Sequence, residues 1–336
     1  MTQPPVVTIC LPTIGRAAML GEALESTRAQ TWPNLEILIL DNAAEEGDGQ
    51  RLITAFAASH PRARILRSET RLPMFANFNR GIYAARGEYI TFLFDDDLLR
   101  PTLVSRAVEL LERYPQAGFA GSNYTLIDAA GQGIQQPNLI AQTGIVPGRR
   151  HIAAQMGCAS MIMATPGVVY RRNLLAAFPF DAALSVYGGD LVMRLRMAEV
   201  ADVALIAEPL VSVRVHPQTE TARITLTEGL TRRAQMLLAY IDEYAARWPA
   251  DRAFVLHLRA RLALAHSATL GWDWLTLPDA AEAEQRRLGL RVVPGGPALA
   301  ATLAASERLG LTPERRRTRL APLLRRLGQG APTPYR

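Results

Sequence analysis

The segment ITFLFDDDLLRP, residues 90–101, places three consecutive carboxylates directly after a run of apolar residues. The apolar run is typical of a buried strand, whereas Asp95, Asp96 and Asp97 repel one another and are costly to desolvate. A solvated turn, with Asp97 capping a helix that begins near Pro101, is the structural interpretation. The functional interpretation is a divalent-cation site, because carboxylate oxygens suit Mg²⁺ and Mn²⁺.

This segment belongs to a regular alternation of predicted strands and helices. Strands are expected where apolar residues run together, at 6–12, 35–41, 63–68, 88–94 and 117–128. Helices are expected between them, at 16–30, 49–59, 74–86 and 101–114. Alternation of this kind predicts an α/β, Rossmann-like fold with a mainly parallel mixed sheet and helices on both faces.

Polar residues follow three of these strands at the point where each one ends. Pro12 and Thr13 follow the first strand, Asp41 and Asn42 follow the second, and the triplet 95–97 follows the fourth. The carboxyl ends of parallel strands share one edge of a sheet, and ligands bind at that edge. We therefore expect these side chains to lie together around a ligand.

The pattern is less regular between residues 140 and 220. Residues 161–172 suggest a strand pair or a strand and a turn, and residues 187–199 suggest a helix with Asp190 in its first turn. Residues 202–217 suggest strands that end near two basic side chains, Arg214 and His216. These segments would complete the first domain.

The chain changes character after Thr221. Residues 228–248 and 251–268 have the spacing of two amphipathic helices. We predict one α/β domain over residues 1–222, which would carry the ligand site, and a helical C-terminal region with a basic tail over residues 223–336.

Composition narrows the class of protein. Apolar residues make up 49% of the chain and charged residues 20%, as in globular proteins. Cys10 and Cys158 lie among apolar neighbours without metal-site spacing, so two buried thiols are expected. Neither a signal-peptide pattern nor an apolar run of about 18 residues is evident, so we predict a cytoplasmic protein.

Positive charge is concentrated at the C-terminus. Residues 301–336 contain eight arginines and two glutamates, and this balance of +6 equals the net charge of the whole chain. Arginine and leucine interleave between Pro313 and Leu327, which favours contact with an anionic membrane. We predict peripheral binding to the inner face of the membrane and no binding of nucleic acid. A solvated tail is the alternative.

Five segments occur in the order found in family 2 glycosyltransferases: PTIGR (12–16), ILILDNA (37–43), TRLPMFANFNRGIYAARGEYITFLFDDD (70–97), YGGD (187–190) and RVH (214–216). The third segment resembles the bacterial spore-coat polysaccharide glycosyltransferases. The resemblance covers residues 5–220 and implies a GT-A fold and an inverting, metal-dependent enzyme. It also implies a nucleotide-sugar donor, UDP-linked in the commonest case, and a saccharide or lipid-linked acceptor in the synthesis of bacterial surface polysaccharide or glycoconjugate.

Carried over position by position, the resemblance implies a role for each site residue. Asp190 matches the catalytic base, Asp96 the ligand of Mn²⁺ or Mg²⁺, and His216 a position that contacts metal or phosphate. The residues expected to bind the nucleotide are Pro12, Thr13, Arg16, Asp41, Asn42, Arg71, Asn79 and Asp95. Within this set, Asp41 would read a base N–H and Asp95 would bind the ribose.

Two positions depart from the family pattern. Phe94 stands where the family often has Asp, so a strict D-x-D motif is absent and only a DXD-like run remains. Gly189 stands where an acidic residue often precedes the base, which leaves the acceptor pocket open to question.

Structural interpretations exist for individual residues as well. Asp190 could cap a helix, His216 could be a surface side chain, Arg71 could pair with Glu69, and Asn79 could be an ordinary helix amide.

Two other functions also fit the sequence in part. One is a catalytically degenerate GT-A domain that serves as a membrane-associated assembly factor. The other is a sugar nucleotidyltransferase, although PTIGRAAML (12–20) supplies only one glycine and one arginine for a triphosphate. The absence of G-x-G-x-x-G after the first strand argues against a dinucleotide oxidoreductase.

Overall fold

The computed structural model describes residues 3–43, 45–158, 161–184, 188–219 and 226–276. The chain divides into two compact units. The first contains Met1–Gly148 and Ile162–Pro217, and the second contains Arg149–Met161 and Gln218–Arg336. The sequence pattern gives no sign that residues 149–161 belong with the C-terminal helices.

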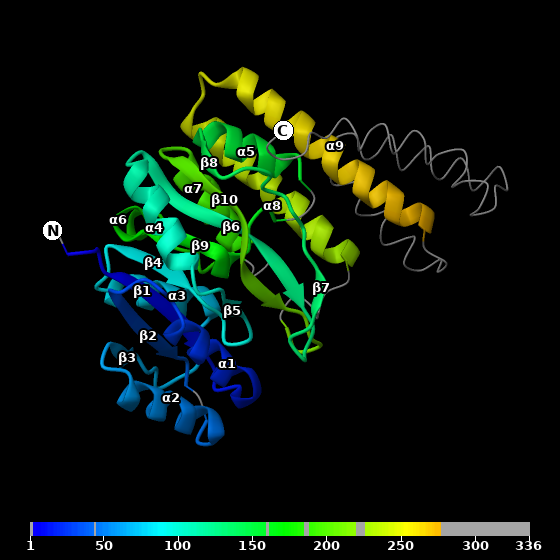
Figure 1. Ribbon diagram of the computed structural model, residues 1–336. Helices are drawn as coiled ribbons and strands as arrows, with labels where there is room; N and C mark the ends of the chain where they lie inside the picture. The colour runs from blue at the N-terminus through cyan, green and yellow to red at the C-terminus, as the bar shows by residue number, and fades with distance from the viewer. Residues whose placement is uncertain (1–2, 44, 159–160, 185–187, 220–225, 277–336) are drawn as a thin grey trace. The chain divides into compact units, whose positions relative to one another are not determined.

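Over its described residues, the first unit is built on one ten-stranded mixed sheet (Figure 1). The strand order is β3 (Ala63–Ile65), β2 (Leu35–Asp41), β1 (Val7–Thr13), β4 (Tyr89–Phe92), β9 (Val168–Arg171), β6 (Ala117–Ile127), β10 (Asp202–Arg214) and β5 (Leu98–Leu99). At one side β7 (Gly133–Gln135) pairs with β6, and β8 (Gly144–Val146) pairs with β10.

The strands of the sheet run in both directions. Strands β1, β2, β3 and β4 run parallel, and β6 runs parallel to β10, whereas β9 lies antiparallel between β4 and β6. The helices that connect or flank them are α1 (Ala17–Arg28), α2 (Asp48–Ser59), α3 (Met74–Ala84), α4 (Leu103–Arg113), α6 (Arg172–Ala177) and α7 (Gly189–Ala198). The predicted α/β fold with a mainly parallel mixed sheet is confirmed.

Helices cover both faces of the sheet because strand side chains alternate between the faces. Ile9 of β1 belongs to the main apolar core, together with buried residues of α1 and α4. Its neighbour Cys10 points to the other face, where α3 lies close. A Cβ built on Gly81 of α3 would lie 2.7 Å from a Leu40 methyl carbon and 3.2 Å from the Cys10 sulfur. Only a glycine allows this helix to approach the sheet so closely.

Several element boundaries differ from the sequence-based expectation. Strand β4 ends at Phe92, so the acidic triplet lies in a turn that leads to the two-residue strand β5. The segment predicted as separate strands over residues 202–217 is a single strand that ends at Arg214. It has register shifts between Ile206 and Val211. The short 3-10 turn Thr165–Gly167 precedes β9. Strands of two or three residues are too short to produce a periodic pattern.

The second unit is helical over its described residues, which include α5 (Gly148–Met156), α8 (Leu226–Arg247) and α9 (Arg252–Thr276). Arg149 forms an ion pair with Asp251 and lies 4.1 Å from the ring centroid of Phe254. Arg261 of α9 donates a 2.5 Å hydrogen bond to the Ala153 carbonyl of α5. These contacts explain why α5 belongs to this unit.

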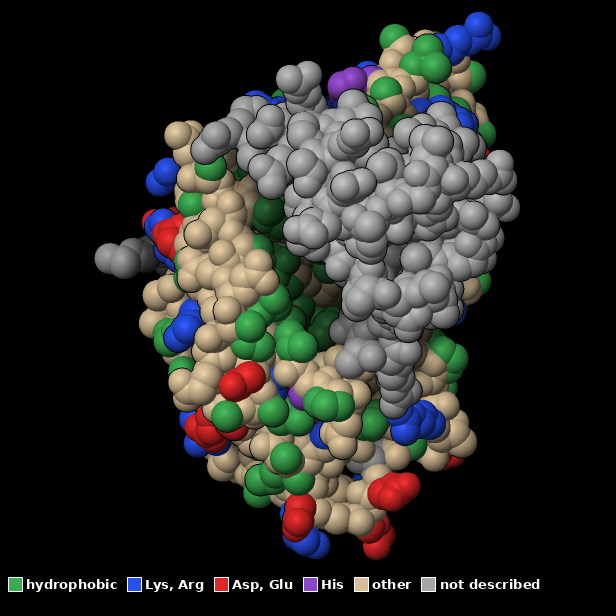
Figure 2. Space-filling view, turned by 90° about the vertical axis from the view of Figure 1, so that its right-hand side faces the viewer, with side chains coloured by type: hydrophobic (Ala, Val, Ile, Leu, Met, Phe, Trp, Pro, Cys, Tyr) green, Lys and Arg blue, Asp and Glu red, His purple; other side chains and the backbone are tan. Residues whose placement is uncertain are grey.

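Charged side chains of both signs are interspersed over the described part of the face seen in Figure 2. Elsewhere in the first unit, local ion pairs join Arg51 to Asp48 and Arg106 to Glu109. The arginine-rich tail, residues 301–336, lies outside the described residues. Across the helices that the structure describes, none is both long and apolar enough to cross a membrane.

Candidate active site

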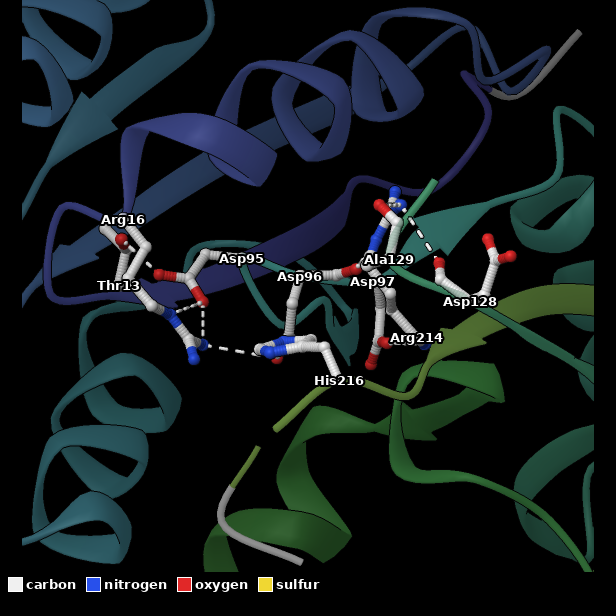
Figure 3. Close-up of polar contacts among 9 residues, drawn as sticks. All are labelled: Thr13, Arg16, Asp95, Asp96, Asp97, Asp128, Ala129, Arg214 and His216. Atoms are coloured by element: carbon white, nitrogen blue, oxygen red, sulfur yellow. Dashed lines mark hydrogen bonds and ion pairs between the residues drawn. The ribbon is translucent and has the colours of Figure 1, made fainter. Parts of the chain in front are cut away.

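Three strand ends meet at one edge of the sheet, as the sequence predicts. Thr13 of β1 is in register with Asp41 of β2, and the amide of Asn42 donates a 2.9 Å hydrogen bond to the Thr13 carbonyl. The turn after β4 brings Asp95 to the same place, where its Oδ2 accepts a 2.6 Å hydrogen bond from the Thr13 hydroxyl (Figure 3). The predicted polar edge therefore exists as one connected cluster.

The loop after β1 holds this cluster in place. The Thr13 hydroxyl accepts a 2.9 Å hydrogen bond from the amide of Gly15, whose φ of 85° suits glycine. A Cβ on Gly49 of α2 would lie 2.0 Å from the Gly15 carbonyl oxygen. The two glycines thus allow the α2 backbone to press against the loop that carries Arg16.

Asp95 and Asp96 are both buried, and basic groups surround them. Arg16 forms an ion pair with Asp95, and its Nη2 lies 3.3 Å from Oδ2 of Asp96. The Nε2 of His216 lies 3.2 Å from the same Asp96 oxygen. His216 is buried, so the alternative that it is a surface side chain is wrong.

Asp97 has a different environment from its two neighbours. Its Oδ1 accepts a 2.8 Å hydrogen bond from the main-chain amide of Arg214. Burial, followed by the charge of Asp96, raises the pKa of Asp97 well above its ordinary value. Asp97 therefore anchors the turn to β10 and does not cap α4, whose N-cap residue is Thr102.

The buried guanidinium of Arg214 holds the main chain of the turn that carries Asp95, Asp96 and Asp97. Its Nε donates to the Asp96 carbonyl at 2.9 Å, and its Nη1 donates to the Ala129 carbonyl at 3.0 Å. Its Nη2 forms a 2.7 Å ion pair with Glu22 of α1. Sequence reasoning noted the RVH segment but missed this role, because a pattern does not show that an arginine at a strand end is buried.

Asp190 lies in the first turn of α7, at the edge of a second polar cluster. Its Oδ2 accepts a short hydrogen bond from the Thr165 hydroxyl and forms a 3.1 Å ion pair with Arg194. Its Oδ1 accepts a 2.8 Å hydrogen bond from the Leu191 amide. The N-cap residue of α7 is Gly188, so Asp190 is not the helix cap.

Arg194 is almost fully buried, and it also donates to the Thr165 hydroxyl at 3.1 Å and to the Tyr170 hydroxyl at 3.3 Å. Burial is the main cause that raises the pKa of Tyr170, so this hydroxyl stays protonated. Sequence reasoning missed Arg194, although its position four residues after Asp190 on a predicted helix was a usable signal.

Gly189 has a packing reason. A Cβ at this position would lie 2.3 Å from a ring carbon of Phe75. Phe75 stacks on Phe180 with 5.2 Å between ring centroids, in a cluster that also includes Phe78, Phe92 and Phe94. Gly189, which departs from the family pattern, therefore leaves room for the ring of Phe75, and a longer side chain at this position would clash with that ring.

The remaining predicted residues are Asp41, Arg71, Asn42, Asn79 and Pro12. Asp41 is buried, with one oxygen 3.7 Å from Arg67, whereas Arg71 is exposed and does not pair with Glu69. The amide of Asn42 bonds to both main-chain groups of Leu72, and the amide of Asn79 does the same with Phe180. Pro12 pairs in register with Leu40 inside the sheet.

Asp96 and His216 suit a divalent cation whose remaining coordination positions are filled by a bound ligand. Among the described residues, no cluster of three or more His, Cys, Asp or Glu side chains could hold an ion by itself. Asp96 and His216 still offer one oxygen and one nitrogen at 3.2 Å from each other. Mg²⁺ is usually held by one or two carboxylates together with substrate phosphates, so this pair fits a cation that arrives with a diphosphate.

Comparisons with known proteins agree on the family. A model described as glycosyl transferase family 2 matches residues 8–177, which is 170 of the 336 residues. Glycosyltransferase GlyG of Streptococcus pneumoniae is 25% identical over 126 residues, 38% of this chain and 42% of that protein. The first three curated relatives are matched over 12%, 42% and 37% of their lengths, so this chain spans less than half of each.

Solved structures agree on the fold. Residues 1–349 of S. aureus TarS, in complex with UDP-GlcNAc, superpose with a TM-score of 0.64 at 15% identity, covering 90% of this chain and 92% of that one. The mannosyltransferase PcManGT of Pyrobaculum calidifontis, in complex with GDP-Man and Mn²⁺, gives a TM-score of 0.55 at 18% identity, covering 98% and 86%. The chain belongs to glycosyltransferase family 2 and has the GT-A fold.

Proposed function

We propose that the protein transfers a sugar from a nucleoside diphosphate sugar to an acceptor hydroxyl, with inversion at the anomeric carbon. The observation that carries this proposal is the buried Asp95–Asp96 pair at the carboxyl edge of the sheet, in contact with Thr13, Arg16 and His216. Adjacent buried carboxylates destabilise a fold unless cations and hydrogen-bond donors offset them. Such a pair suits a ligand that brings both a cation and hydroxyl groups.

The donor is assigned to the β1–β2 side of this edge. Asp41 can accept a base N–H, Asp95 can accept a ribose hydroxyl, and Thr13 orients Asp95. Arg71 is exposed and makes no hydrogen bond or ion pair with a described residue, so its guanidinium is available to an anionic donor.

Three of the predicted donor residues act indirectly in this proposal. Asn42 and Asn79 fix loops, because their amides are already bonded to the main chain. Pro12 shapes the end of β1. The titles of the structural neighbours include UDP-GlcNAc and GDP-Man, and we take a UDP-linked sugar as the first donor to test.

Asp190 is assigned as the general base. Thr165 and Arg194 hold its Oδ2, so Oδ1 has the free lone pair that can accept a proton. Asp190 would take the proton of the acceptor hydroxyl while that oxygen bonds to the anomeric carbon and the bond to the diphosphate oxygen breaks. A single displacement of this kind inverts the anomeric configuration.

A Mn²⁺ or Mg²⁺ ion held by Asp96 and His216 would act as a Lewis acid that offsets the charge of the leaving diphosphate. Arg214 contributes by fixing the carbonyl of Asp96, and thereby the turn that presents the carboxylate. His216 lies two residues after the end of β10 and is buried, with its Nε2 3.2 Å from Asp96.

The acceptor is proposed to be a saccharide or a lipid-linked saccharide of the bacterial surface. The basic tail, residues 301–336, would bring the enzyme to an anionic leaflet on the cytoplasmic side. Comparing sedimentation with anionic liposomes for the full chain and for a chain ending at Leu311 tests this part separately.

The test of the proposed function begins with thermal shifts for a panel of nucleotide sugars, with and without Mn²⁺. A donor at 100 times its dissociation constant adds about 2.7 kcal/mol of stability. The stabilising donor is then assayed for transfer and for hydrolysis, in the wild type and in Asp96→Ala. We expect metal-dependent turnover that Asp96→Ala abolishes. Donor binding without any turnover would favour the degenerate-domain alternative, and unchanged Mn²⁺-dependent affinity in Asp96→Ala would place the cation elsewhere.

A further inference from the structure

Arg16 occupies an unusual position between two buried carboxylates. Its guanidinium pairs with Oδ1 of Asp95 and reaches Oδ2 of Asp96 at 3.3 Å (Figure 3). The side chain of Arg16 is 30% exposed, whereas those of Asp95 and Asp96 are 3% and 11% exposed. The cation is therefore the accessible member of the cluster, and the carboxylates are its fixed members.

The backbone at Arg16 is fixed even though the side chain is accessible. Arg16 is the N-cap residue of α1, and its carbonyl accepts hydrogen bonds from the amides of Met19 and Leu20. The preceding Gly15 is pressed by Gly49 of α2. A long side chain on a fixed backbone can change its contacts by rotation, with no movement of the loop.

Arg16 is a permanent cation at this site, because an arginine guanidinium does not lose its proton in proteins. It lies beside Asp95 and 3.3 Å from Asp96. The oxygen that Arg16 approaches on Asp96 is the one that faces His216. A divalent ion held by Asp96 and His216 would need this same oxygen.

We propose that Arg16 is the resident counter-ion of Asp96 in the donor-free protein, and that a diphosphate-bound divalent cation displaces it. This inference rests on the proposed function. Once displaced, the guanidinium stays next to Asp95 and is free to bind an anionic oxygen of the donor, for which its fork of N–H groups is suited. Metal and donor then bind cooperatively, because each is favoured by the state that the other creates.

The proposal predicts the affinity for Mn²⁺ alone, measured without any assay of activity. Wild type, Arg16→Gln, Arg16→Lys and Arg113→Gln are titrated with MnCl₂ at 0.15 M salt, and free Mn²⁺ is followed by its EPR signal. At this salt concentration, exposed charges more than about 8 Å away are largely screened. Arg113→Gln removes one exposed positive charge from the same unit, at a residue of α4 that has no assigned role in the site, so it controls for a change in net charge.

We expect Arg16→Gln to bind Mn²⁺ alone about tenfold more tightly than the wild type, within the usual range of coupling factors. Arg16→Lys should change the affinity less, and Arg113→Gln should match the wild type. Adding UDP or GDP should tighten Mn²⁺ binding strongly in the wild type and less in Arg16→Gln. Urea unfolding of each variant checks that the fold is kept.

Three results would overturn the inference. Equal or weaker Mn²⁺ binding by Arg16→Gln would show that Arg16 does not compete for Asp96. An equal gain in Arg113→Gln would reduce the effect to net charge. If the wild type binds no Mn²⁺ even with UDP or GDP, the metal part of the proposed function fails together with this inference. If that binding occurs but Arg16→Gln shows no gain, only the inference fails.

Discussion

Replacing Asp190 by Asn should do more than remove the proposed base, because Asp190 is also the carboxylate partner of a buried cation. Arg194 has a side chain that is 2% exposed and cannot lose its proton. Its other described partners, the hydroxyls of Thr165 and Tyr170, carry no compensating charge. The substitution Asp190→Asn keeps an acceptor oxygen but removes the negative charge.

The size of the effect follows from this geometry. Breaking a buried ion pair by removing one partner costs about 3–5 kcal/mol. The side chain of Asp190 is 13% exposed, and the amide oxygen can still accept a hydrogen bond, so we expect the lower end, about 3 kcal/mol. For a unit of this size, that corresponds to a fall in Tm of roughly 6–12 °C. Transfer should fall by at least about 10²-fold.

A double-mutant cycle separates the ion pair of Asp190 from its proposed role as the base. Urea unfolding is measured for Asp190→Asn, Arg194→Gln and the double variant, together with transfer at a temperature where each is folded. The double variant should be more stable than the sum of the single losses predicts, with a coupling energy of about 0.5–3 kcal/mol, and should remain inactive. Wild-type stability in Asp190→Asn would refute the ion-pair argument. Near-wild-type transfer in the double variant would show that the base is another residue.

Three further substitutions test the packing and charge of the site. Gly189→Ala should push the ring of Phe75 aside and reduce transfer more than donor binding, measured as separate kcat and KM effects. Gly49→Ala should displace the loop at Gly15 and weaken donor affinity, measured by thermal shift. Hydrogen exchange without metal should show little change in local stability elsewhere in the protein. Asp97→Asn should raise the free energy of unfolding at neutral pH. Because the folded-state pKa of Asp97 is raised, its contribution to stability is full at low pH and is lost as pH rises through that pKa, so the gain should vanish near pH 4.

The sheet and its polar edge could be predicted because both follow from local periodicity. The predicted strand 35–41 matches β2 at both ends, and the predicted strand 6–12 differs from β1 by one residue at each end. The direction of the strands then requires Thr13, Asp41 and Asp95 to share one edge. A resemblance to a family adds roles to these residues, but their proximity follows from the fold class alone.

The supporting residues could not be predicted, because their roles depend on burial. Arg194 and Arg214 look like surface arginines in the sequence, where every basic residue apart from histidine is arginine. The structure buries both, one behind Asp190 and the other behind the acidic turn. The aromatic contact of Gly189 is equally hidden, since Phe75 is 114 positions away in the chain and only the fold brings the two together.

Three consecutive carboxylates are compatible with a buried strand end because each one has a different neighbour. Asp95 pairs with Arg16, Asp96 faces a histidine, and Asp97 accepts a main-chain amide and has a raised pKa. Full ionisation of all three would be costly, and the raised pKa of Asp97 lowers that cost. The turn can therefore present the carboxylates of Asp95 and Asp96 to a ligand while Asp97 anchors it to β10. The same division supports the assignment of the proposed ligand-binding role to the first two positions of the triplet, since Asp97 already accepts the main-chain amide of Arg214.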